Sequence, residues 1–236
     1  MTTFDETDTR VQLEVWSDIA CPWCYVGRRN LAVALADLDE RERPDVTWRA
    51  FLLDPNVPEE GVDNDTYFAE RFADRLPQIR EGQERLQLLG EELGIEFRFD
   101  RQRIRPNTLR AHRVIAAAKR HDAVEPVLDE LFSAYFERGV DIGDEARLRE
   151  VVLDAVTDPE LAARISDDAE HDASLEAQVA DDIATAQGLG ISGVPCFVAD
   201  RAMAVPGAVP PDGLAKFLAE AAARLEHDHE GHDEEV

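Results

Sequence analysis

The sequence predicts an α/β fold in which a small sheet carries a large all-helical insertion between its second and third strands. Three observations support this prediction. A strand-helix-strand pattern occupies residues 11–53, helical periodicity dominates residues 63–188, and two short strand patterns with a closing helix occupy residues 194–225.

The first unit begins with a strand over residues 11–16, where apolar and polar side chains alternate. A helix over residues 22–38 follows, because its leucines recur at spacings of four and three. Residues 46–53 then form a second predicted strand. The unit therefore places residue 21 at a strand-to-helix junction.

The middle section is predicted to be entirely helical, with short loops at residues 139–144 and at 158–159. Its apolar stripes are formed by Leu86, Leu89, Leu93, Val114, Ile115 and Ala118. We expect residues 63–188 to form an inserted helical domain. Residues 11–62 and 189–225 then form the two parts of the parent domain.

The chain closes with predicted strands at residues 194–198 and 202–205 and an amphipathic helix over residues 211–225. Without the insertion, the order of elements is that of a thioredoxin-like sheet. The acidic, histidine-containing tail, residues 226–236, has few apolar side chains, so we expect it to be disordered.

The charge balance limits the partners. The chain of 236 residues has 51 acidic and 25 basic residues and a net charge of −26, which would repel a phosphate backbone and argues against a nucleic-acid partner. Lysine occurs only at Lys119 and Lys216. Dispersed carboxylates with almost no lysine resemble proteins of salt-accumulating halophiles, and we expect a halophilic protein.

The sequence also indicates in which cellular compartment the protein is expected. It has no apolar run near the roughly 20 residues that span a bilayer, so we expect no membrane association. Residues 1–10 are polar and acidic rather than signal-like, which favours the cytoplasm. Structural disulfides are rare there, so a close cysteine pair is expected to be catalytic or metal-binding.

The motif Cys21-Pro22-Trp23-Cys24 has the properties that disulfide exchange needs. At a helix start, unpaired N–H groups and the helix dipole stabilise a Cys21 thiolate, while Cys24, one turn in, is more shielded. Pro22 suits the first helical position, and Trp23 offers aromatic surface to a partner. We expect Cys21 to be the nucleophile and Cys24 to resolve the mixed disulfide.

Two other interpretations of the pair were weighed. A structural zinc site needs two more ligands, but Cys196 is the only other cysteine and the body of the chain has no histidine pair at finger spacing. The pair could also be two inert buried cysteines. We favour a redox pair and expect neither a metal nor another cofactor.

Several short motifs together resemble the DsbA-like thioredoxin-fold oxidoreductases, and within them the FrnE-type branch, which is related to 2-hydroxychromene-2-carboxylate isomerases and kappa-class glutathione transferases. The resemblance covers residues 11–224. The matching residues are Ser17, Asp18, Cys21, Pro22, Trp23, Cys24, Tyr25, Gly27, Asn107, Thr108, Ala111, His112, Arg113, Gly193, Val194, Pro195, Ala204, Val205, Gly207 and Ala208.

The resemblance implies that Pro195 has a cis peptide bond and lies against the cysteine pair. A cis X-Pro bond there would leave the Val194 backbone to pair with an extended substrate. An ordinary trans proline is the alternative. Placing Asn107 and His112 at the active-site side of an inserted helix also follows from the family, and suggests substrate binding, although a structural role for His112 is the simpler account.

Four other features stay open on the sequence. Cys196 could face the pair or lie inertly buried, which we favour. Asp18 could raise the pKa of the thiol, shuttle protons or cap the following helix. Asn56 could contact a small thiol or serve a turn. The tail histidines could bind nickel or copper opportunistically; these are His227, His229 and His232.

We therefore expect a thiol-disulfide oxidoreductase that acts on protein or low-molecular-weight thiol and disulfide substrates. The alternative is a glutathione-type isomerase or transferase of the same superfamily, and the presence of Cys24 argues against it. A second alternative is a non-catalytic binding or metal-delivery module. The sequence does not give the direction of the reaction or the oligomeric state.

Overall fold

The structure, a computed structural model, describes residues 10–233, and it describes side chains up to residue 227. The strands are β1 (Gln12–Ser17), β2 (Asp45–Ala50), β3 (Val62–Asp63), β4 (Ile104–Arg105), β5 (Cys196–Ala199) and β6 (Met203–Pro206). The helices are α1 (Pro22–Ala36), α2 (Asn64–Phe72), α3 (Leu76–Leu93), α4 (Leu109–Arg120), α5 (Val124–Phe136), α6 (Glu145–Ala155), α7 (Pro159–His171), α8 (Ala173–Gly188) and α9 (Pro211–Asp233), with 3₁₀ turns at Ala73–Arg75 and Phe99–Arg101.

The main sheet has the strand order β2-β1-β5-β6. β1 pairs in parallel with β2 and antiparallel with β5, which in turn pairs antiparallel with β6. The strands β2 and β1 come from residues 12–50 and the strands β5 and β6 from residues 196–206, so two segments far apart in sequence meet where β1 pairs with β5. The predicted α/β fold with a helical insertion between the second and third strands of this sheet is confirmed.

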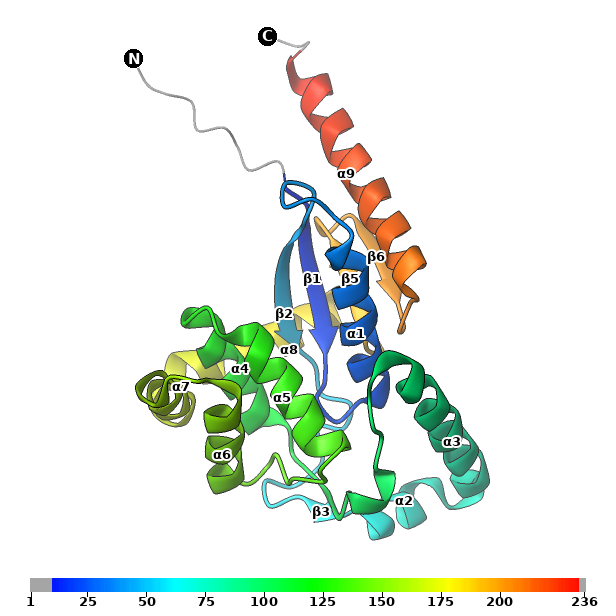
Figure 1. Cartoon of the computed structure of the whole chain (residues 1–236), viewed down its shortest axis with the longest axis vertical. Helices are drawn as coiled ribbons and strands as arrows, with labels where there is room; N and C mark the ends of the chain where they lie inside the picture. The colour runs from blue at the N-terminus through cyan, green and yellow to red at the C-terminus, as the bar shows by residue number, and fades with distance from the viewer. Residues whose placement is uncertain (1–9, 234–236) are drawn as a thin grey trace.

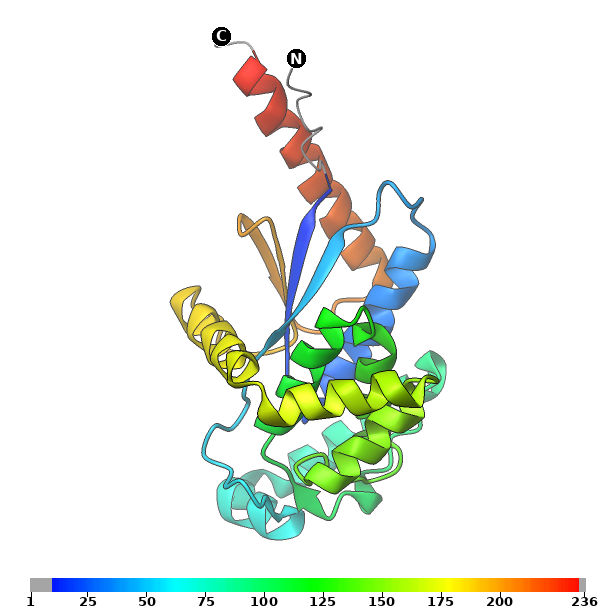
Figure 2. The same cartoon turned by 90° about the vertical axis from the view of Figure 1, so that its left-hand side faces the viewer.

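The sheet is covered on both faces. α1 and α9 lie on one face, and α8 crosses the other, as the turned view makes plain (Figure 2). The helices α2 to α7 gather at the end of the sheet where β1 leads into α1, and the last turns of α9 lie at the opposite end (Figure 1). The loop between β1 and α1 therefore lies at the junction of sheet and insertion.

Four helices of the insertion begin in the same way, with an aspartate that accepts a hydrogen bond from a backbone N–H of the first turn. These aspartates are Asp63, Asp144, Asp158 and Asp172. Such caps satisfy backbone donors that the helix cannot satisfy itself and favour the positive end of its dipole. The many acidic residues thus also set where the helices start.

The alternation of β1 divides its side chains between the two faces. Leu13 and Val15 join the large core that α1 and α9 cover, whereas Trp16 packs with Ala186 of α8 in a second, smaller cluster. Glu14 lies on the same face as Trp16, since alternate residues of a strand share a face. A carboxylate buried there needs partners.

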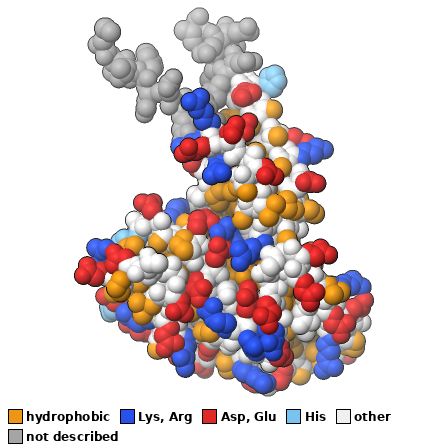
Figure 3. Space-filling model, viewed as in Figure 1, with side chains coloured by type: hydrophobic (Ala, Val, Ile, Leu, Met, Phe, Trp, Pro, Cys, Tyr) orange, Lys and Arg blue, Asp and Glu red, His pale blue; other side chains and the backbone are white. Residues whose placement is uncertain are grey.

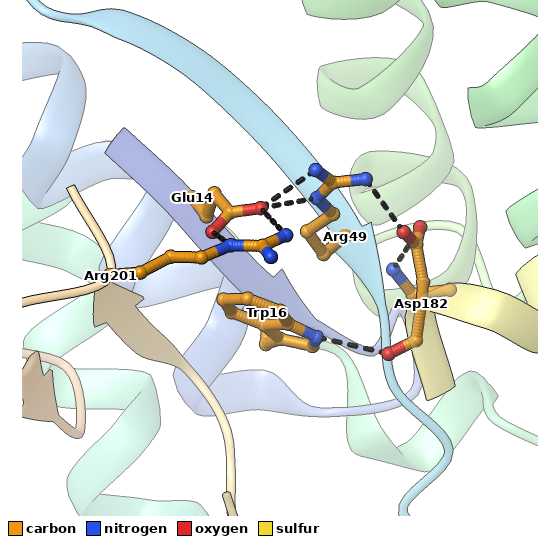
Figure 4. Close-up of polar contacts among 6 residues, drawn as sticks. Glu14, Trp16, Arg49, Asp182 and Arg201 are labelled. Carbon is orange, nitrogen blue, oxygen red and sulfur yellow. Dashed lines mark hydrogen bonds and ion pairs between the residues drawn. The ribbon is translucent and has the colours of Figure 1, made fainter. Parts of the chain in front are cut away.

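Those partners form a network that fastens α8 to the sheet (Figure 4). Glu14 accepts from Arg49 of β2 at 2.7 Å and from Arg201 at 2.9 Å. Arg49 also donates to Asp182 of α8 at 2.9 Å. The backbone carbonyl of Asp182 accepts from the Trp16 indole at 3.3 Å, so one helix residue contacts two strands.

Several predicted boundaries change. β2 ends at Ala50 rather than at residue 53, because the next residues bond Asp18 of the loop before α1 and His112 of α4. β5 begins at Cys196, after Pro195, which has no N–H for a strand ladder. The insertion is not entirely helical, because β3 and β4 form a short antiparallel pair.

The tail also differs from the prediction. α9 continues beyond residue 225 to Asp233, since no proline interrupts the sequence there; residues 234–236 lie outside the described residues. Acidic side chains are dispersed over the face shown in Figure 3 and alternate with basic ones rather than forming one patch. None of the described helices is long and apolar enough to cross a membrane.

Candidate active site

Cys21 stands at the N-cap of α1, where the chain leaves β1 and its short loop. Its backbone is extended, with φ −101° and ψ 113°, and Pro22 takes the first helical position. The carbonyl of Cys21 accepts from the N–H of Cys24 at 3.0 Å, which closes the first turn. The predicted strand-to-helix placement of the motif is therefore what the structure shows.

The two thiols have different environments. Cys21 is 4% exposed and Cys24 is fully buried at 0%. A hydrogen bond from Cys24 lowers the pKa of Cys21, and backbone N–H groups of the first turn add to the effect, while burial and Asp18 oppose it. Burial raises the pKa of Cys24 well above its usual range. Cys21 is thus the more readily ionised of the two thiols.

The loop before β5 lies against the pair. The Val194–Pro195 peptide bond is cis, as the family resemblance implies. The Val194 carbonyl lies 3.6 Å from the Cys21 sulfur, within reach of a thiol hydrogen bond. Pro195 packs on α1 at Gly27, where an added Cβ would come within 2.9 Å of the proline ring. A larger residue at position 27 would therefore clash with the proline ring.

Asp18 supports the loop that carries Cys21. Its carboxylate is buried and accepts from the N–H of Ala20 at 3.1 Å and of Leu53 at 2.7 Å. His112 of α4 approaches it, with Nε2 at 3.8 Å from Oδ1. Asp18 thus contacts its own loop after β1, the segment that follows β2 and helix α4 of the insertion, just before the cysteine motif in the chain.

His112 and Asn107 have different surroundings. His112 is buried, and its Nε2 lies 3.0 Å from the Phe51 carbonyl, which makes it a hydrogen-bonded histidine beside Asp18. The side chain of Asn107 donates to the Val57 carbonyl at 2.8 Å and accepts from the Leu109 N–H at 3.0 Å. The structure gives Asn107 no contact with either cysteine.

A groove of about 440 Å³ opens beside the motif. Its lining is mainly aromatic and aliphatic, with Trp23 at 45% exposure on its rim. The lining comprises Ala20, Pro22, Trp23, Leu53, Tyr67, Phe68, Arg71, Phe72, Ile79, Gly82, Gln83, Leu86, Phe99, Gln102, Arg105 and Phe136. The surface beside Cys21 therefore suits a partner with bulky apolar groups.

Two parts of this groove were not predicted from the sequence. The first is the aromatic stripe of α2, whose signal was the close spacing of Tyr67, Phe68 and Phe72. The second is Arg105, which donates to the Ala20 carbonyl at 3.1 Å and lies over the Tyr67 ring, 5.3 Å from its centroid. No sequence pattern connects Arg105 to residue 20, so only the fold shows that contact.

Cys196 lies on the other face of the sheet from Pro195. Its register partner is Trp16, and it packs with Val198 and Ala186 under α8, where burial raises the pKa of its thiol. It has no described contact with Cys21 or Cys24. Asn56 serves a turn, with its backbone and side chain both bonded to Asp54.

The tail histidines are the sequence-predicted candidates for metal ligation. Among the residues that the structure describes, no group of three or more His, Cys, Asp or Glu side chains could hold a metal ion. His227 is exposed, and the side chains of His229 and His232 lie outside the described residues.

Comparisons with known proteins agree with this geometry. The DSBA-like thioredoxin domain family matches residues 12–219. A solved structure of a probable DsbA oxidoreductase from Streptomyces coelicolor is 32% identical and superposes with a TM-score of 0.78 over 90% of each chain. A Bacillus subtilis protein, uncharacterized YwbO, is 25% identical over 89% of this chain and 96% of its own.

A more distant structure shares the fold. The cytosolic disulfide reductase DsbM from Pseudomonas aeruginosa, solved with GSH, is 18% identical with a TM-score of 0.60, covering 93% of this chain and 99% of its own. The family match spans nearly the whole described chain, including the cysteine motif and the cis-proline loop. The chain belongs to the DSBA-like thioredoxin domain family.

Proposed function

We propose that this protein is a dithiol-disulfide oxidoreductase that works through Cys21 and Cys24. The observation that carries the proposal is the asymmetry of the two thiols, one at the helix N-terminus with a lowered pKa and the other fully buried beneath it. Membership of the DSBA-like family supports the same chemistry. The proposed activity needs no cofactor other than the cysteine pair.

In the proposed reduction, the Cys21 thiolate attacks one sulfur of a substrate disulfide. A Cys21–substrate bond forms, the substrate S–S bond breaks, and the released thiolate takes up a proton. Cys24 then loses its proton and attacks the Cys21 sulfur, which releases the second substrate thiol and leaves a Cys21–Cys24 disulfide. The reverse sequence oxidises a dithiol, and the direction follows from the relative reduction potentials.

Pro195 and Val194 have a positioning role in this proposal. The cis bond turns the Val194 carbonyl toward Cys21, so an extended substrate can lie along residue 194 with its sulfur at the nucleophile. Pro22 and Trp23 contact the substrate at the groove rim. His112 acts through Asp18 on the loop rather than on the substrate, and the structure offers no observation that favours substrate binding by Asn107.

The groove favours protein substrates over a small thiol alone. Its lining is largely apolar and can accept a bulky side chain next to a substrate cysteine. Because a structure of similar fold was solved with GSH, a small thiol is a second candidate, as the reductant that regenerates the enzyme. We also propose that the protein works in a salt-rich cytoplasm, which its charge of −26 and scarcity of lysine support.

The test is disulfide exchange in molar salt, by insulin reduction and by refolding of a scrambled disulfide substrate. We expect both activities to be lost in Cys21→Ser and in Cys24→Ser, and to be retained in Cys196→Ser. If Cys24→Ser kept full turnover while a small-thiol conjugate formed, the transferase would be the correct function. No exchange by the wild type would favour a non-catalytic binding module.

A further inference from the structure

The groove beside the cysteine motif differs in charge from the rest of the molecule. Of the 236 residues of the chain, 51 are acidic, yet none of the residues that line this groove is acidic. The only charged side chains among them are Arg71 and Arg105. A second groove, of about 610 Å³ between helices of the insertion, is lined by four glutamates together with three arginines. Grooves without carboxylates are therefore not the general rule in this protein.

Both arginines of the groove lie around one aromatic ring. The guanidinium carbon of Arg105 is 5.3 Å from the centroid of the Tyr67 ring, and that of Arg71 is 5.8 Å from the same centroid. Each distance is within the range of a cation–π contact. The positive charge of the groove is therefore concentrated around Tyr67.

The carboxylates that partly balance these charges are withdrawn from the groove. Asp54 accepts from Arg71 and from the Tyr67 hydroxyl, each at 3.0 Å, but its side chain is only 4% exposed. Asp18, which interacts electrostatically with Arg105, is 2% exposed. The side chain of Arg71, in contrast, is 47% exposed. A ligand in the groove therefore meets guanidinium groups and no carboxylate.

Arg105 is held close to the nucleophile. Its Nη1 donates to the Ala20 carbonyl at 3.1 Å, and Ala20 directly precedes Cys21. Since a carbonyl oxygen is about 2.8 Å from the next Cα, this nitrogen lies within about 6 Å of the Cys21 Cα. In an extended substrate, the residues two positions from a cysteine share its face of the strand, about 6.6 Å away. A side chain at either position can therefore reach the guanidinium group.

We propose that this groove selects substrate polypeptides that have a carboxylate two residues from the reacting cysteine, and that Arg71 and Arg105 bind this carboxylate. The inference rests on the proposed oxidoreductase function and names its substrate class. Charge complementarity carries it, because the net charge of −26 repels an acidic polypeptide everywhere except where the lining is cationic. Glutathione also has carboxylates, but it has no bulky apolar group for the aromatic lining, so a polypeptide is the better match.

The test uses three peptides of the form Ala-Xaa-Leu-Cys-Leu-Xaa-Ala, in which both Xaa positions are Glu, Gln or Lys. Each cysteine is joined by a disulfide to 2-thiopyridine, a neutral leaving group. Cys21 loses its proton to solvent and its thiolate attacks the peptide sulfur. The Cys21–peptide bond forms, the bond to the pyridyl sulfur breaks, and the released thiolate takes up a proton to give 2-thiopyridone. Its absorbance is followed in molar KCl, where attraction at long range is screened and a preference reports direct contact.

The wild type should react about 3- to 10-fold faster with the Glu peptide than with the Gln peptide, as expected for a half-buried hydrogen bond between charged groups, and slowest with the Lys peptide. The ratio of the Glu to the Gln rate should fall in Arg71→Gln and in Arg105→Gln, and approach one in the double variant. A ratio within one variant cancels any general change in the reactivity of Cys21. Arg103→Gln is the matched control, since Arg103 is exposed but does not line the groove, and it should keep the wild-type ratio.

A Gln or Lys peptide that reacted as fast as the Glu peptide would overturn the proposal, as would a double variant that kept the wild-type ratio. The pyridyl disulfide of glutathione tests the other source of carboxylates. If the arginine variants slowed its reaction but left the peptide ratio unchanged, the groove would serve glutathione instead.

The neutral 2-hydroxyethyl pyridyl disulfide tests the oxidoreductase function separately. Release from this reagent no faster in the wild type than in Cys21→Ser would contradict that function rather than the selection of acidic substrates. The same reagent and the thermal midpoint show that each arginine variant is folded with a reactive Cys21.

Discussion

At the residue scale, the two thiols of the site differ in pKa because of where they lie at the start of α1. Cys21 has N–H groups of the helix start and a hydrogen bond from Cys24, while Cys24 has no exposed surface. The largest contribution that lowers the pKa of Cys21 is the hydrogen bond from Cys24. The second cysteine therefore favours the thiolate form of the first, in addition to the resolving role proposed for it.

Replacing Cys24 tests this activation. In Cys24→Ala we expect the pKa of Cys21 to rise, because its principal hydrogen-bond donor is lost. At pH 7 the thiolate fraction and the alkylation rate should both fall. Thiolate absorbance near 240 nm measured against pH reports the change, and Cys196→Ala should leave the Cys21 titration in place. A lower Cys21 pKa in Cys24→Ala would contradict the interpretation.

The contact between α1 and the cis-proline loop can be tested at Gly27. An alanine Cβ there would lie 2.9 Å from the Pro195 ring, so Gly27→Ala should displace the loop and cost about 1–3 kcal/mol of stability. Disulfide exchange should slow as well. Urea unfolding and insulin reduction are the measurements.

The matched control is Gly188→Ala at the end of α8, where an added Cβ meets nothing within 4 Å. It should unfold at the same urea concentration or a higher one, since alanine favours a helix. Equal changes in stability and in insulin reduction for Gly27→Ala and Gly188→Ala would show that the packing of Pro195 does not require glycine at residue 27.

At the element scale, α8 matters because it joins the insertion to the sheet. Its buried Asp182 accepts from Arg49 at 2.9 Å and from the Ala50 N–H at 3.1 Å, at the end of β2 that leads to the site. The neighbouring Asp181 is exposed. Two adjacent aspartates on one helix thus have different environments.

Asp182→Ala should lower the free energy of unfolding by about 3 kcal/mol, because it removes two charge-assisted bonds and leaves a buried backbone donor unpaired. Asp181→Ala should change it by no more than about 0.5 kcal/mol. Chemical denaturation of both variants in the same salt gives the comparison. Similar losses in the two variants would mean that the network in Figure 4 does not anchor the helix.

The sequence predicted those elements whose pattern is local. The leucine spacing of α1 and the alternation of β1 follow from periodicities of 3.6 and 2. The aromatic lining from α2 and the contact of Arg105 with residue 20 depend on chain segments that meet only after folding. No local signal marks them, which is why the cysteine motif and the cis-proline loop were predicted and this lining was not.

At the scale of the whole molecule, the net charge of −26 is the largest unfavourable electrostatic feature. Dispersed carboxylates repel one another over a screening length that falls from about 10 Å at 0.1 M salt to about 3 Å at 1 M. The thermal midpoint should therefore rise between 0.1 M and 2 M KCl. Sucrose of equal osmolality separates charge screening from solvent exclusion, and a flat response to KCl would contradict the salt-adapted assignment.

The exposure of Trp23 gives the molecule an optical property of its own. The chain has three tryptophans, and Trp16 and Trp48 are buried at 0% and 7%, whereas Trp23, between Cys21 and Cys24 in the sequence, is 45% exposed. A collisional quencher such as acrylamide should thus extinguish mainly the emission of the indole inside the motif. The quenched emission comes from a residue of the cysteine motif, so oxidation of the pair and the proposed substrate docking should be measurable without attaching a dye.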